Sequence, residues 1–208
     1  MDPQVLPFAL AAIVAAAFVA VLVFIMRRRS GALLEKLGPA FELGTSRPAR
    51  PFGAGVEGLY QGFFSRYTLQ QASQYDRGGA MLRVDATSSQ KWSAQRSQAG
   101  TGLLVTLGVL KDIEVGHAEL DQHFRLTADD GDALRGLFGI DRVRDALLRF
   151  ANTANADSVS VREDRFDFKW SPRSAELDED PEVLRERLTV AIELTTAAGA
   201  PPRLEAPR

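Results

Sequence analysis

The stretch VSVREDRFDFKW, residues 159–170, decides the fold class of this 208-residue chain. Apolar and polar side chains alternate on both sides of Glu163-Asp164, which is the pattern of two strands that each bury one face. The polar pair in the middle is typical of a turn. The sequence therefore predicts an antiparallel β-hairpin with its valine and aromatic side chains in a core.

Helical patterns lie on both sides of this hairpin. Asp-Pro-Glu at 180–182 predicts a helix start, because aspartate caps free N–H groups and proline fits the first turn. That helix should run to about Ala198. Upstream, Asp130 should cap a helix to about Leu137, and a second helix with one apolar face is expected over 142–152.

Further strands are expected nearer the N-terminus, because short apolar or alternating runs there are separated by glycine. The segment 88–100 is polar and is expected to be an exposed loop or wide hairpin. The fold class is therefore α+β, with mainly antiparallel strands packed with about three helices. The expected strands are Val56–Phe64, Arg66–Gln71, Met81–Thr87, Leu103–Val109 and His123–Thr127.

An uncharged apolar run, Val5–Met26, precedes this domain. It has 22 residues, thirteen of them Val, Leu, Ile or Phe. At 1.5 Å per residue, such a helix would span about 33 Å, against about 30 Å for the hydrocarbon core of a bilayer. The sequence therefore predicts a single transmembrane helix in front of the domain.

Three alternatives to a transmembrane helix fit less well. A cleaved signal peptide carries its positive charges before a shorter apolar region, but here they follow it. A buried core helix is disfavoured because no polar face interrupts the run, and a lipoprotein needs a cysteine, which the chain lacks.

Arg27, Arg28 and Arg29 directly follow the run, whereas the N-terminal flank has only Asp2. Because cytoplasmic flanks carry the excess of Lys and Arg, these arginines are the predicted membrane-orienting residues. They place the N-terminus outside and the domain in the cytoplasm, on an inner or cell membrane.

These patterns divide the chain into four parts. Residues 1–29 are the expected anchor with its basic stop, and residues 30–55 are a Pro- and Gly-rich tether. Residues 56–198 form the cytoplasmic α+β domain, and residues 199–208 are a tail expected to be disordered.

Composition and motifs exclude several functions. After residue 29 the chain has 22 Lys and Arg against 26 Asp and Glu, whereas nucleic-acid binders are usually basic. Absence of cysteine excludes thiol chemistry, and neither a Gly-x-Ser-x-Gly elbow nor a phosphate loop occurs. No cofactor is therefore expected.

One cluster of metal-type ligands remains, namely His117, Glu119, Asp121 and His123. In an extended strand all four would lie on one face, but neighbours two apart are then about 7 Å apart, which makes closure around one ion difficult. The alternative interpretation is a polar turn, with Asp121 as its cap and Phe124 directed inward.

The segment GHAELDQHFRL at 116–126, the helical pair, the hairpin and the final Asp-Pro-Glu helix resemble a group of uncharacterised bacterial domains of unknown function. The resemblance covers residues 105–198. It implies this domain architecture, often behind one transmembrane helix, and implies no activity.

The sequence thus favours a membrane-anchored, non-enzymatic interaction or scaffolding domain with an unknown protein partner. The alternative is a membrane-tethered, metal-dependent hydrolase that uses His117, Asp121 and His123. A peripheral lipid sensor is a third possibility.

Overall fold

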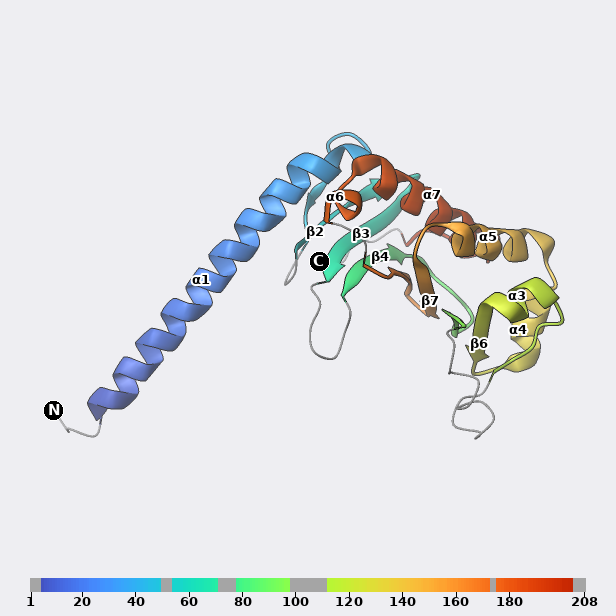
Figure 1. Ribbon diagram of the computed structural model, residues 1–208, viewed down its shortest axis with the longest axis horizontal. Helices are drawn as coiled ribbons and strands as arrows, with labels where there is room; N and C mark the ends of the chain where they lie inside the picture. Colours follow the sequence, from blue (N-terminus) through green and yellow to red (C-terminus); the bar gives the residue numbers. More distant parts are fainter. Residues whose placement is uncertain (1–4, 50–53, 71–77, 98–111, 173–174, 204–208) are drawn as a thin grey trace.

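A computed structural model describes residues 5–49, 54–70, 78–97, 112–172 and 175–203 (Figure 1). An eight-stranded antiparallel sheet forms its centre, in the order β1-β2-β3-β4-β8-β7-β5-β6. The strands are β1 (Arg47–Pro48), β2 (Ala54–Tyr60), β3 (Phe63–Gln70), β4 (Gly79–Asp85), β5 (Trp92–Arg96), β6 (Phe124–Ala128), β7 (Ala156–Arg162) and β8 (Arg165–Trp170).

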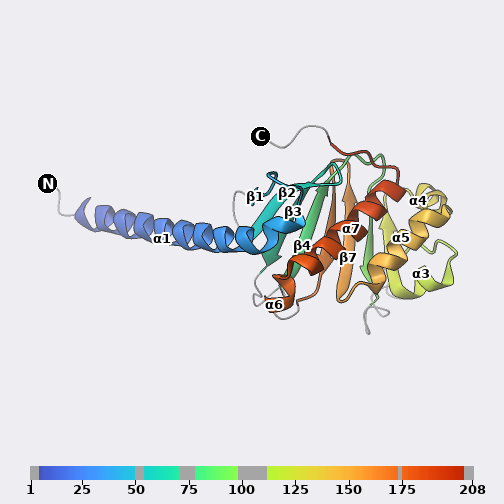
Figure 2. The same ribbon diagram turned by 90° about the horizontal axis from the view of Figure 1, so that it is seen from above.

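Helices pack on one face of this sheet, so the domain has two layers (Figures 1 and 2). The longest of them in the domain, α7, crosses the sheet beside α5. The helices are α1 (Val5–Leu37), α3 (Ala118–His123), α4 (Gly131–Phe138), α5 (Asp141–Asn152), α6 (Ala175–Asp178) and α7 (Pro181–Ala197), with a 3-10 turn, η1 (Gly38–Ala40), after α1.

The core lies between the sheet and the helices. Phe150 of α5 is at its centre, with its ring 5.5–6.3 Å from the rings of Phe124, Phe168 and Trp170. All four side chains are buried. Leu188 of α7 completes this layer, so strand, hairpin and helix meet in a single core.

The hairpin prediction is confirmed, since β7 and β8 pair from Arg162↔Arg165 to Ala156↔Trp170. The final helix is confirmed as well, because the Asp180 side chain accepts a hydrogen bond from the Glu182 amide at 2.8 Å. Asp130 likewise caps α4. The predicted α+β class is confirmed by the sheet and its helical layer.

Two strand predictions were wrong in detail. The expected strand 56–64 is interrupted at Gln61 and Gly62, both with positive φ, which joins β2 and β3 by a two-residue hairpin turn. The polar segment 88–100, which was expected to be an exposed loop or a wide hairpin, contributes the single strand β5. The expected strand Leu103–Val109 lies outside the described residues.

The predicted transmembrane anchor is corrected by the structure. Within the described part of the chain, no helix is long and apolar enough to cross a membrane. The single-pass membrane architecture is therefore contradicted.

The C-terminal end of α1 belongs to the core. Helix α1 continues without interruption through the first part of the expected tether, where Leu33 and Leu37 are buried. Phe41 follows them and closes over Gly58 of β2, where a Cβ would meet its ring at 2.9 Å. At the other end of the chain, Pro202 forms a bridge with Ala86. The division of the chain into four parts is otherwise a prediction.

Candidate interaction surface

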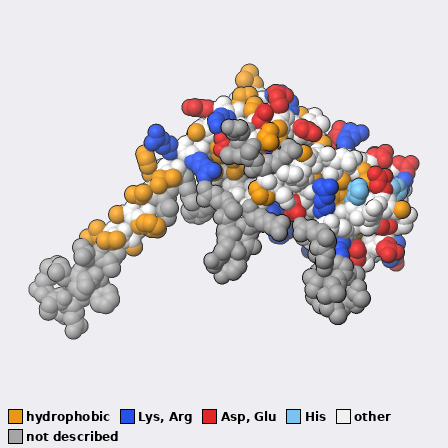
Figure 3. Space-filling model, viewed as in Figure 1, with side chains coloured by type: hydrophobic (Ala, Val, Ile, Leu, Met, Phe, Trp, Pro, Cys, Tyr) orange, Lys and Arg blue, Asp and Glu red, His pale blue; other side chains and the backbone are white. Residues whose placement is uncertain are grey.

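The N-terminal part of α1 projects from the domain as an apolar arm, which we define as residues 13–25 (Figures 1 and 3). No polar side chain occurs in this stretch. The exposed large side chains of the arm, each 55–66 % exposed, are Ile13, Val14, Phe18, Val19, Val21, Phe24 and Ile25. A helix that is apolar around its circumference is normally buried, so this arm is the clearest candidate for a binding surface.

Polar contacts fix the base of the arm to the domain. Lys36 pairs with Glu179 at 2.6 Å, and Arg185 donates to the carbonyl oxygen of Pro39 at 3.1 Å. Together with the buried leucines, these contacts hold the arm in a fixed direction. Arg28 and Arg29 are exposed beyond the apolar stretch; their predicted orienting role, shared with Arg27, is not tested by the structure, nor is the predicted cytoplasmic location.

A buried polar cluster connects α6, α7 and β3. Arg187 pairs with Asp178 at 2.8 Å and donates to the Tyr67 hydroxyl, which donates to the Asp178 carbonyl oxygen at 3.0 Å. The Arg187 guanidinium also lies 5.0 Å from the Trp170 ring. Burial raises the pKa of Tyr67, so its hydroxyl remains a donor. The cluster is structural, because its polar groups are used within the protein.

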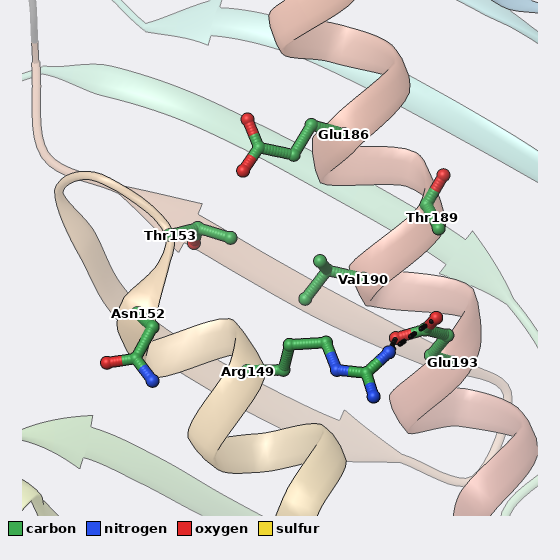
Figure 4. A pocket seen from close by; sticks show the side chains of 7 residues that line it. All are labelled: Arg149, Asn152, Thr153, Glu186, Thr189, Val190 and Glu193. Atoms are coloured by element: carbon green, nitrogen blue, oxygen red, sulfur yellow. Dashed lines mark hydrogen bonds and ion pairs between the residues drawn. The ribbon is translucent and has the colours of Figure 1, made fainter.

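A groove of about 390 Å³ runs between α5 and α7 (Figure 4). Arg149 of α5 crosses it and pairs with both carboxylate oxygens of Glu193, at 2.9 and 2.8 Å. The hydroxyl of Thr153 is already bonded to the Phe150 carbonyl oxygen and to the Trp170 indole nitrogen. The described lining residues therefore offer neither an activated nucleophile nor a base placed to activate one.

The His117 segment does not form the arrangement that a metal would require. Residues 118–123 are helical, so the strand spacing that would place the four polar side chains on one face is lost. The Asp121 carboxylate accepts hydrogen bonds from the amides of Val115 and His117, both at 3.1 Å. Among the described residues, no group of three ligand-type side chains could hold an ion.

No local signal marked the arm as a binding surface, because the same run of residues predicted a membrane span. The structure shows that the arm is exposed next to a folded core. The buried Arg187 cluster was also missed, since it joins residues more than 100 positions apart.

Comparisons with known proteins are sparse. No protein-family model matches the chain, and no curated protein matches it. It is similar to a solved structure, the mycobacterial trehalose monomycolate transport factor A, with 13% identity and a TM-score of 0.42 over 86% of this chain and 98% of that chain. Both values are too low for that protein's function to be carried over. The resemblance to uncharacterised bacterial domains stays a prediction.

Proposed function

We propose that this protein is a non-enzymatic interaction module whose apolar arm is buried by apolar helices of a protein partner. The observation that carries the proposal is the exposure of the arm next to a well-packed domain. A folded soluble protein rarely leaves so large an apolar surface uncovered unless another molecule covers it.

The energetics favour a partner that contacts more than the arm. Complete burial of a large apolar side chain contributes about 1.5–3 kcal/mol, so covering the exposed half of seven contributes roughly 7 kcal/mol. Association itself costs about 4–15 kcal/mol in lost freedom. The arm is therefore sufficient to direct binding, but a stable complex requires further contacts with the domain.

The fixed direction of the arm also supports a binding role. Because α1 enters the core at Leu33 and Leu37, little conformational entropy is lost when a partner packs on it. Pre-organisation of this kind lowers the cost of association.

The hydrolase alternative has no comparable support, because the Asp121 carboxylate is engaged by backbone amides.

Photo-crosslinking tests the proposal directly. A photoreactive amino acid is placed in the full chain at Phe18 or at Phe24, and, as a control, at the exposed Arg142 of α5. We expect one protein adduct from both arm positions and none from the control. The adduct protein should also form a stoichiometric complex that Phe18→Glu abolishes and Arg142→Glu preserves.

Two results would contradict the proposal. Adducts only to lipid would assign the arm to a different environment. A protein adduct whose complex survives Phe18→Glu would show that the arm does not carry the interaction.

A further inference from the structure

The face of the sheet opposite the helices carries a continuous row of polar side chains. Strand register aligns one residue from each of the eight strands, and all eight positions have the parity that points away from the core. We call this set the polar row. Its members are Arg47, Glu57, Arg66, Arg83, Asp167, Ser160, Ser93 and Thr127.

Each carboxylate in the polar row is shared by two guanidinium groups. Glu57 accepts from Arg47 at 2.8 Å and from Arg66 at 2.6 Å. Asp167 accepts from Arg83 at 2.8 Å and from Arg165 at 3.1 Å. Arg165 also pairs with Asp164 of the turn at 3.4 Å, so four guanidinium groups are paired with three carboxylates.

Glu57 and Asp167 lie deeper than the arginines that bind them. The Glu57 and Asp167 side chains are 2% and 15% exposed, whereas those of Arg66, Arg83 and Arg165 are 22–28% exposed. At Glu57 and Asp167, an approaching molecule thus meets guanidinium groups first.

These arginines keep unused donors. Arg47, Arg66 and Arg83 each bind their carboxylate through Nε, and within the described residues their Nη groups have no hydrogen-bond partner. The Nε contact fixes the direction of each guanidinium plane, so the free Nη donors are pre-organised to bind a further carboxylate.

More positive charge lies beside the polar row. By strand parity, Arg125, Arg162 and Lys169 share this face, and Asp85 is the further acidic residue on it. The described strands thus present seven cationic and three anionic side chains here, although the whole chain has a net charge of −2. Nε and Nη1 of Arg125 are shielded from water and have no hydrogen-bond partner among the described residues, which is costly for a charged group unless an anion binds.

Backbone pairing at the sheet edges is largely occupied. Beside β6, the Ile113 amide donates to the Leu126 carbonyl oxygen. Beside β2, the amides of Glu42 and Ala49 donate to carbonyl oxygens of β2. A partner segment would therefore lie across the face instead of adding a strand at an edge.

We infer that the open sheet face is a docking surface for an extended, carboxylate-rich segment of a partner protein, and this inference does not depend on what covers the arm. Eight strands about 4.8 Å apart span roughly 34 Å, which corresponds to an extended segment of about ten residues. Charge complementarity selects Asp and Glu, and the hydroxyls of Ser93, Thr127 and Ser160 suit peptide groups. A single-stranded nucleic acid would require exposed aromatic rings for stacking, and Phe64, the described aromatic with this parity, is buried.

Fluorescence anisotropy with a labelled ten-residue peptide of alternating Glu and Ser tests the inference. The full chain is kept in a neutral detergent at about 0.05 M salt, where charge pairs are weakly screened. We expect saturable binding that Arg83→Gln and Arg162→Gln each weaken about fivefold or more, with further loss at higher salt. Arg162 has no carboxylate partner among the described residues, so its substitution leaves the internal salt bridges intact.

Arg142→Gln on α5 is the matched control, because it removes the same charge from the helical side. The affinity of this variant for the peptide should stay within about twofold of the affinity of the unsubstituted protein. Absence of saturable binding would overturn the inference, and so would equal affinity of Arg162→Gln and Arg142→Gln. Tighter binding of a ten-nucleotide single-stranded DNA, or of vesicles of anionic lipid, would overturn the assignment to a protein segment.

Discussion

Individual residues in this domain show how burial and charge compete. Burial raises the pKa of Asp85, although Arg66, Arg83 and Arg203 act in the opposite direction. Glu57 is almost fully buried and is held between two arginines.

The raised pKa of Asp85 predicts a pH-dependent effect of Asp85→Asn. Folding favours the protonated carboxyl, so the stability of the unsubstituted protein relative to the variant should fall as pH rises past about 4, the usual pKa of Asp. The difference should level off above the raised pKa. Urea denaturation of both proteins between about pH 3 and pH 7 measures it. A difference that is independent of pH would contradict the prediction, and Asp145→Asn at an exposed site serves as the control.

Because Arg187 and Asp178 form a buried pair, we expect Arg187→Met to lower the free energy of unfolding strongly. Removal of one partner leaves a buried charge, which typically costs about 3–5 kcal/mol. Arg149→Met removes an exposed partner of Glu193 and should cost about 1 kcal/mol or less. Chemical denaturation compares the two free energies of unfolding. If both variants lose the same free energy of unfolding, the Arg187 cluster does not stabilise the fold more than an exposed ion pair does.

Among the elements, those with strong local signals were predictable from the sequence. The β7–β8 hairpin alternates cleanly, and the caps of α4 and α7 are aspartates in the expected places. Phe124 and the aromatic side chains of the hairpin were expected to face inward, and Phe124, Phe166, Phe168 and Trp170 are all buried.

Elements without local signals were missed. Strand β5 has a polar composition, with inward-facing Trp92 and Ala94, and its pairing with β6 and β7 depends on distant residues. The six-residue α3 has no side-chain cap to mark its start. The polar row could not be predicted either, because it exists only through the register of eight strands.

The end of α1 predicts where an independent domain begins. A fragment of residues 30–208 keeps Leu33, Leu37 and Phe41 in the core, whereas residues 45–208 lack all three. At about 1.5–3 kcal/mol for each buried side chain, the shorter fragment should be less stable by about 4 kcal/mol or more. Thermal and urea unfolding of both fragments measures this. Leu43→Ala in the longer fragment should change little, because Leu43 is fully exposed; equal stability of the two fragments would exclude α1 from the core.

At the scale of the whole molecule, a closed core is combined with two surfaces of opposite character that no described helix or strand covers. The arm is apolar, and the open sheet face is cationic. Composition alone indicated neither a basic face nor a binding arm, because the charges balance over the chain and the apolar run predicted a membrane span. The three-dimensional arrangement separates these features and supports a role in binding.

Spin labelling at the arm tests the central claim most directly. The chain has no cysteine, so Phe18→Cys provides a single attachment site, with Arg142→Cys as the exposed control. The label is examined in the isolated protein and in the complex recovered with its crosslinked partner, using oxygen and a water-soluble nickel complex as relaxation agents. The proposed function predicts that the arm label is protected from both agents in the complex, while the control label stays accessible. An arm label that remains accessible to the nickel complex, or that is shielded from it but open to oxygen as in lipid, would contradict burial of the arm by a protein partner.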